Sequence, residues 1–275
     1  MLDLQRIEEE HYQLREGEQL QDFMTLMLQY IGDSDPELRD ELIYPTFFEW
    51  IHEENRFTDT ELRSLLAVLT DEQHLFYHMG SEGDQAVFTR TFSVLPIALI
   101  VQRHRKQPFL DHAEFQHLKH SLLRYYNEEK DLRGYLSEGG WAHSAAHGAD
   151  ALVELVQCPE SDAAVQHEVL AAVQGMLYNG IHIFNEEEDE RIVSIVDTMI
   201  DKGLLQQQEI ADWIGGLTQC VDWPRSRGQS IARVNSKNFL RCLYFRRGQD
   251  SHGNVIAAVL RTAEVKLNKF SIRNC

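Results

Sequence analysis

Residues 88–101, FTRTFSVLPIALIV, carry the pattern that decides the fold. Apolar residues recur at i, i+4, i+7 and i+11, the spacing of one helix face: Phe88, Phe92, Leu95 and Leu99. A second apolar stripe lies on the opposite face: Val94, Ile97 and Val101. Arg90 heads that second stripe, so we expect it to be buried and to need a carboxylate partner. The stretch therefore predicts a helix that is buried on both sides.

Helix signals recur along the rest of the chain. Asp35-Pro36 opens a helix with an N-cap and a proline at its first position, and Thr58-x-x-Glu61 is a capping box. Another helix starts at Asp111 and Glu114 and ends near Tyr126. Later helices are expected over about 161–180, 187–202, 206–219, 236–246 and 253–269.

About twelve helices and no strand are expected in all, which predicts an all-α protein. We expect a single domain over residues 1–275, built as a solenoid-like, HEAT-like stack of antiparallel helical hairpins. An irregular helical bundle or an α/α toroid is the alternative.

The composition indicates a chain that stays in the cytoplasm. Mean hydropathy is −0.38, and no apolar run approaches the ~18 residues that span a bilayer. The first ten residues are amphipathic and acidic, unlike a signal peptide. Four scattered cysteines predict free thiols in a reducing compartment: Cys158, Cys220, Cys242 and Cys275. We therefore expect a cytoplasmic protein with no membrane partner.

The charge is large and unevenly distributed. The formal net charge of −18 argues against nucleic-acid binding, because phosphates repel such a surface. Residues 1–224 hold 15 basic and 42 acidic side chains, whereas residues 225–275 hold 11 and 2. We expect the basic portion, 225–275, to dock on the acidic body, with an anion or partner site as the alternative.

The most site-like stretch is residues 139–152, GGWAHSAAHGADAL. A helix beginning at Trp141 would carry His143, His147 and Asp150 along one face, because 100° per residue brings them within a narrow stripe. Two imidazoles and a carboxylate can hold a divalent metal such as zinc, iron or manganese. They can equally act as catalytic acid–base groups or form a hydrogen-bonded structural cluster.

Other charged residues are candidates for the same site. Glu188 and Asp189 lie one turn before buried stripes, and Asp131 and Arg133 precede the motif helix. We predict that Arg90 or Arg133 pairs with Asp150, Glu188 or Asp189, which would make one connected ligand-binding site. The alternatives are structural ion pairs, and carboxylates that favour the dipole at a helix start.

Four segments then resemble a known bacterial family, domain of unknown function 2785. They are FTRTFS (88–93), EKDLRGY (129–135), GWAHSAAHGADAL (140–152) and EDERI (188–192), and the match covers roughly residues 60–215. The resemblance carries no activity. It marks these positions as the ones to follow: Arg90, Asp131, Arg133, Trp141, His143, His147, Asp150, Glu188 and Arg191.

The sequence lacks the Walker, dinucleotide-binding, G-x-S-x-G and H-E-x-x-H motifs. It predicts either a His/Asp polar groove that binds a metal or a small ligand, with hydrolysis as a possible reaction, or a non-enzymatic helical-repeat scaffold for a protein partner. Whether the chain is an enzyme is left open.

Overall fold

The computed structural model describes residues 2–247 and 255–271. Helices take up 66% of the chain, and twelve α-helices lie in the described part, so the predicted all-α class is confirmed. The helices form two compact units, Met1–Glu160 and Ser161–Cys275.

The first unit begins with α1 (Leu2–Glu9) and α2 (Leu20–Gln29). A longer helical stretch follows, in which α3 (Tyr44–Phe48) lies between two π-helical segments, η1 (Glu37–Ile43) and η2 (Glu49–Glu53). The unit continues with α4 (Asp59–Leu69), α5 (Ala86–Lys106), α6 (His112–Glu128) and α7 (Ser144–Leu155).

Local capping fixes the starts of α4 and α6. Thr58 Oγ1 accepts from the amide of Glu61 at 3.3 Å, while the Glu61 carboxylate accepts from the amide of Thr58 at 2.8 Å. Asp111 and Glu114 make the same reciprocal pair at 2.9 and 2.7 Å. Both capping signals read from the sequence are therefore confirmed.

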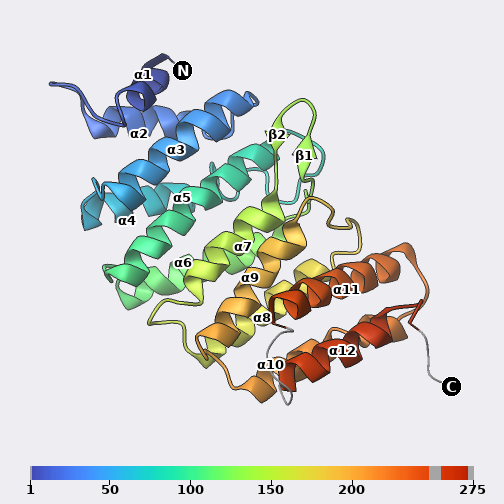
Figure 1. Ribbon diagram of the computed structural model, residues 1–275. Coiled ribbons are helices and arrows are strands. Elements are labelled where there is room, and N and C mark those ends of the chain that lie inside the picture. Colours follow the sequence, from blue (N-terminus) through green and yellow to red (C-terminus); the bar gives the residue numbers. More distant parts are fainter. Residues whose placement is uncertain (1, 248–254, 272–275) are drawn as a thin grey trace. The chain divides into compact units, whose positions relative to one another are not determined.

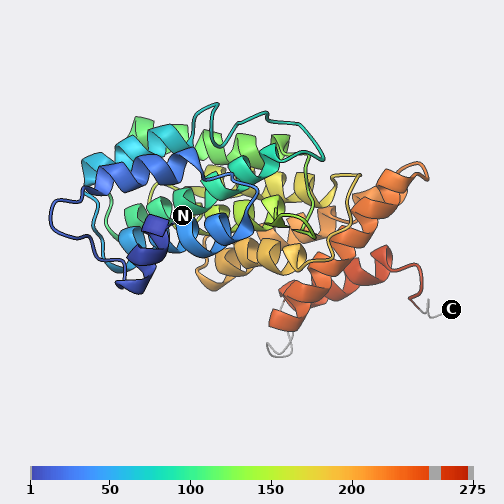
Figure 2. The same cartoon turned by 90° about the horizontal axis from the view of Figure 1, so that it is seen from above.

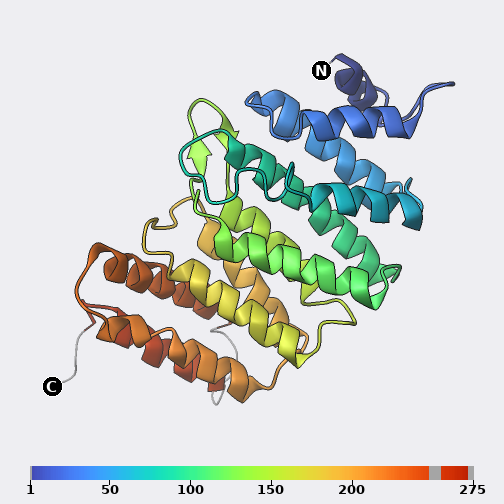
Figure 3. The ribbon, with the colours of Figure 1, turned by 180° about the vertical axis from the view of Figure 1, so that it is seen from behind.

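The core of the first unit is α5 packed side by side with α7 (Figure 1), and α6 lies against α7 (Figure 3). Phe92 on α5 meets His147 on α7, and Arg105 further along α5 meets Glu154 further along α7. These two helices therefore run parallel, with α6 between them in sequence, as successive hairpins would place them.

Helix α5 corrects one expectation. Its 21 residues are long and apolar enough to cross a membrane by length and composition, although the sequence was expected to hold no such run. Most of that window is buried in the structure, and the core helix of a globular protein passes the same test. The buried Arg90 in its first turns has a polar partner, as described below.

The second unit contains α8 (Ala163–Leu177), α9 (Glu188–Asp201), α10 (Gln207–Gly216), a short 3₁₀ turn η3 (Gln219–Asp222), α11 (Arg227–Arg247) and α12 (Val255–Leu267). Helix α11 begins nine residues before the predicted 236, because Ser226 caps it by accepting from the amide of Gln229 at 3.0 Å. Helices α11 and α12 lie side by side (Figure 2).

Alternate helices also run parallel in this unit. His167 on α8 contacts Glu209 on α10, and one turn later the Trp213 indole donates to the carbonyl of Leu170 at 3.0 Å.

Two arginines of the basic segment pair with acidic residues of α9, Arg246 with Glu190 and Arg247 with Asp197. Helix lengths vary within both units, and the HEAT-like repeat stays a prediction.

Candidate functional site

One segment of the first unit, residues 129–143, is held in place by a buried ion pair and by hydrogen bonds. Both side chains of the pair Arg90–Glu129 are fully buried, and Arg90 donates to the two carboxylate oxygens at 2.6 and 2.8 Å. The same carboxylate accepts from the amides of Lys130 and Asp131, each at 2.9 Å. The expected burial of Arg90 is therefore confirmed, and its partner is the first residue of the segment.

Asp131 makes the second set of contacts. Its carboxylate accepts from Arg133 at 2.7 and 2.6 Å and from the amide of Gly83 at 2.9 Å. The hydroxyl of Ser144, the first residue of α7, donates to the Asp131 carbonyl at 2.6 Å. Arg90 therefore pairs with Glu129 and Arg133 with Asp131. The single site that these arginines would share with Asp150, Glu188 or Asp189 stays a prediction.

Arg39 provides a third contact that the sequence did not reveal. It is fully buried in η1 and donates to the carbonyls of Gly139 at 2.5 Å and Asp33 at 2.6 Å. Its guanidinium stands 4.0 Å from the ring centre of Phe88 and 4.5 Å from that of Phe92, within cation–π range. Burial lowers the pKa of Arg39.

Beside Arg39, the carboxyl of Asp40 has an unusually high pKa. Burial raises its pKa from 3.8 to about 6, and the Arg39 guanidinium 3.3 Å away only partly opposes this. The glycine at 140, with φ +71°, leaves room for this carboxylate, because a Cβ there would lie 3.0 Å from an Asp40 oxygen. Asp40 therefore titrates next to the segment 129–143.

The end of the segment folds into a two-stranded antiparallel hairpin, which corrects the expectation of no strand. Strand β1 (Tyr135–Leu136) pairs with β2 (Gly140–Trp141), and Tyr135 lies opposite Trp141. The amide of His143 then donates to the carbonyl of Arg133 at 3.0 Å. Trp141 is therefore in a strand and does not begin the motif helix.

Helix α7 starts at Ser144, three residues later than predicted. His143 is its N-cap residue and has left-handed backbone angles, φ 50° and ψ 34°, which are unusual for a residue with a side chain. Because His143 lies outside the helix, its position does not follow from the predicted helix face, which assumed 100° of rotation per residue from Trp141 onward. Its ring still comes close to that of His147, with centroids 5.8 Å apart.

Four rings follow one another and make a ring row: Tyr135, Trp141, His143 and His147. Trp141 meets Tyr135 edge to face at 5.0 Å and stacks on His143 at 4.5 Å with 24° between the planes. Exposure falls along the row, from 56% for Tyr135 and 39% for Trp141 to 9% and 8% for the imidazoles. At the inner end, His147 meets Phe92 at 5.5 Å.

Asp150, the third member of the predicted set, is half-buried further along α7. Burial, and after it the nearby charge of Asp150, raises the pKa of Tyr126 on α6. Gly148 permits this close approach of α7 to α6, because a Cβ there would lie 2.7 Å from the Tyr126 ring.

The predicted metal set has no support in the geometry. Among residues 2–247 and 255–271, no group of three or more His, Cys, Asp or Glu side chains is arranged to hold a metal ion. Within the first unit, the imidazoles contact aromatic rings on two sides, which suits stacking more than ligation.

The remaining predicted residues belong to α9 in the second unit. Glu188 is buried at the start of that helix, and its carboxylate accepts from the amides of Asn185 at 3.1 Å and Glu186 at 2.8 Å. Burial raises the pKa of Asp189, which accepts from the thiol of Cys242 at 3.6 Å. Arg191 is exposed.

Comparison with known proteins confirms the family resemblance. The family described as "Protein of unknown function (DUF2785)" matches residues 75–245. The chain belongs to this family. No curated protein and no solved structure is similar enough to match. The match begins inside the first unit and ends in α11, so it includes the segment 129–143, the ring row and α9.

Proposed function

We propose that this DUF2785 protein binds a small, flat organic molecule on its ring row. The observation that carries the proposal is the gradient of exposure from Tyr135 and Trp141 to the nearly buried His143 and His147. Exposed aromatic faces can stack on a flat ligand, and imidazole nitrogens can donate or accept a hydrogen bond at its edge.

The rigid support of the row favours binding over a purely structural role. The buried Arg90–Glu129 pair and the bond from the Gly83 amide to Asp131 fix the start of segment 129–143, and Arg39 fixes Gly139 in its hairpin. A binding group gains affinity when its supporting residues hold it in place before the ligand arrives. The polar residues of the motif serve this support, and the two outer rings, Tyr135 and Trp141, are exposed.

The backbone at His143 is a second supporting feature. A histidine in the left-handed region costs roughly 1 kcal/mol or more, and such residues cluster at functional sites. A glycine or asparagine would relieve this cost without an imidazole. We therefore assign the His143 ring a direct role in ligand contact. Catalysis by His143, His147 and Asp150, including hydrolysis, stays a prediction.

The test uses a matched pair of tryptophans. Trp141 and Trp223 are 39% and 41% exposed, and each meets a tyrosine edge to face at 5.0 Å, Trp141 with Tyr135 and Trp223 with Tyr178. We expect indole, benzimidazole, adenine and nicotinamide, screened by saturation-transfer NMR, to include a binder. Binding should be lost in Trp141→Ala and kept in Trp223→Ala.

A His143→Asn variant separates contact from folding. Asparagine accepts the left-handed backbone, so the variant should stay folded by circular dichroism while the imidazole is removed. Loss of the NMR signal in the folded variant supports the proposal. Equal loss of signal in the Trp141 and Trp223 variants, or no binder in the panel, would reject it.

A second candidate function, binding of a protein partner, is favoured by a groove between α11 and α12. The groove, about 560 Å³ in volume, has an apolar floor and the strongly exposed Phe245 and Val265 at its side. The charged residues of its lining are two arginines, Arg241 and Arg261, and one acid, Glu264, so the partner we propose is an acidic amphipathic helix. A Leu/Glu model helix should bind and a Leu/Lys helix should not, and Phe245→Ser should abolish binding.

We also propose that the protein works in the cytoplasm. The cysteines at positions 158, 220 and 242 are free thiols, as a reducing compartment would keep them, and Cys275 lies outside the described residues. Fractionation of cells that express the tagged full-length chain would test this assignment.

A further inference from the structure

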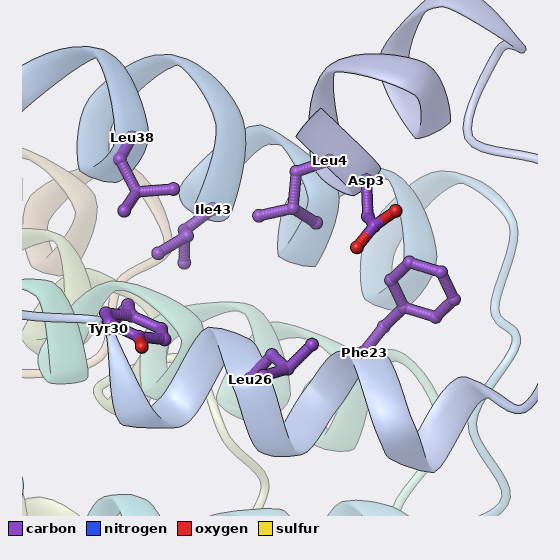
Figure 4. A pocket seen from close by; sticks show the side chains of 7 residues that line it. All are labelled: Asp3, Leu4, Phe23, Leu26, Tyr30, Leu38 and Ile43. Atoms are coloured by element: carbon purple, nitrogen blue, oxygen red, sulfur yellow. The ribbon is translucent and has the colours of Figure 1, made fainter. Parts of the chain in front are cut away.

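A separate small cavity lies in the first unit between α1, α2 and η1 (Figure 4). Its volume is about 180 Å³. Its lining shares no residue with the ring row: Asp3, Leu4, Phe23, Leu26, Tyr30, Leu38 and Ile43.

The walls of the cavity are mostly fixed and apolar. Leu4, Phe23, Leu38 and Ile43 are buried, whereas Leu26 and Tyr30 of α2 are 47% and 43% exposed. The cavity therefore opens past Leu26 and Tyr30, and its floor is part of the packed core. Apolar walls that are already in place bind a ligand without the cost of ordering them.

Asp3, in the first turn of α1, is the only charged residue of the lining. Figure 4 shows its carboxylate beside the Phe23 ring, with Tyr30 at the other end of the cavity. In the described part of the chain, Asp3 has no ion pair. Arg6 stands 5.9 Å from the centre of the Phe23 ring but is paired with Glu10 and Glu18. The negative charge of Asp3 is therefore available to a cation.

We propose that this cavity binds a small protonated amine carried on a single ring. An apolar cavity of about 150 Å³ holds a benzene molecule, so this one accommodates a ring with one or two further atoms. The ring occupies the apolar floor. The ammonium group stays at the opening, where it pairs with Asp3 and remains partly hydrated, which avoids the cost of burying a charge.

The test compares three probes of nearly the same shape and different charge: benzylamine, benzyl alcohol and benzoate. Binding is followed on the full chain through the methyl NMR signals of Leu4, Leu26, Leu38 and Ile43. We expect benzylamine to bind about three- to fivefold more tightly than benzyl alcohol, as an exposed ion pair would give. Benzoate should bind more weakly than both.

Two variants locate the effect. Asp3→Asn should reduce benzylamine affinity to that of benzyl alcohol. Asp22→Asn, which neutralises the first-turn acid of α2 outside the lining, should leave it unchanged. Leu26→Trp should fill the opening and abolish binding of both probes, and because Leu26 is half-exposed this change spares the core. Leu26→Phe is the milder form of the same change.

Each outcome decides the proposal. It is supported if charge preference is lost in the Asp3 variant alone and binding is lost when Leu26 is enlarged. It is overturned if none of the probes shifts the four methyl signals, if benzoate binds as well as benzylamine, or if the Asp3 and Asp22 variants behave alike. Trp141→Ala should not change benzylamine binding, so failure here is distinct from failure at the ring row.

Discussion

Breaking the buried pair Arg90–Glu129 should be one of the most costly single changes in the first unit. Arg90→Met removes both carboxylate contacts and leaves the Glu129 charge buried. It also removes the donor to the carbonyls of Tyr77 at 3.0 Å and His78 at 3.3 Å. Loss of one partner from a buried ion pair costs about 3–5 kcal/mol of unfolding free energy, and we expect a value in this range.

Glu129→Gln isolates the charge, because the amide oxygen can still accept from the amides of Lys130 and Asp131. We expect Glu129→Gln to lower the free energy of unfolding by about 3 kcal/mol. The double variant with Arg90→Met should lose about 2 kcal/mol less than the sum of the two single variants. The neighbouring Glu128 is the matched control, since it pairs with Arg124 at the surface. Glu128→Gln should cost about 0.5 kcal/mol or less.

Urea unfolding followed by far-ultraviolet circular dichroism measures the four variants and the unsubstituted protein. The reasoning is refuted if Arg90→Met costs less than about 1 kcal/mol, or if Glu129→Gln costs no more than Glu128→Gln. Arg90→Met should also cost more than Asp150→Ala, because Arg90 is fully buried whereas Asp150 is half-buried.

Other changes test packing, ionisation and the basic segment. Gly148→Ala should destabilise by about 1–3 kcal/mol in urea, because its Cβ would meet the Tyr126 ring at 2.7 Å, while Gly215→Ala, with no atom within 4 Å, should stabilise by up to about 1 kcal/mol. Folding raises the pKa of Asp40 from 3.8 to about 6, so the folded state binds more protons than the unfolded state between these two pH values. The free energy of unfolding therefore falls as pH rises through this range. In Asp40→Asn, the free energy of unfolding should fall by about 2–3 kcal/mol less over the same pH range. Identical pH profiles of melting temperature for this variant and the unsubstituted protein would contradict the prediction. Deletion of residues 225–275 should lower the melting temperature and increase dye binding, because α11 packs on α9; an unchanged remainder would show that the basic segment is independent.

Local signals in the sequence predicted much of the helical framework. Thr58 and Asp111 cap helices through side chains three residues away, so their effect is contained in a short window. The burial of Arg90 followed from apolar residues on both sides of its helix. Its partner Glu129 lies 39 residues away, and only the packed fold brings the two together.

The candidate site was predicted less completely. Arg39 heads an apolar stripe of the kind that marks Arg90, formed by Leu42, Ile43, Phe47 and Trp50, so its burial could have been expected. Its partner Gly139 lies 100 residues away, and only the packed fold brings the two together. The strands of the hairpin are two residues long, too short for an alternating pattern, so Trp141 was assigned to the following helix. The sequence correctly predicted that the rings of His143 and His147 lie close together. They do so because His143 is a left-handed N-cap residue, and not because both lie on one helix face.

The π-helical pitch of η1 has an evolutionary consequence. A π turn contains about one residue more than an α turn, so η1 corresponds to an α-helix that has accepted a one-residue insertion. Deletion of one residue between Glu37 and Ile43 would restore the α pitch and rotate the preceding residues by about 100° relative to those that follow. Arg39 would then turn away from Phe88 and Gly139. Relatives that keep the wide turn can keep this arginine in the core, whereas those that lost it must hold the hairpin by another contact.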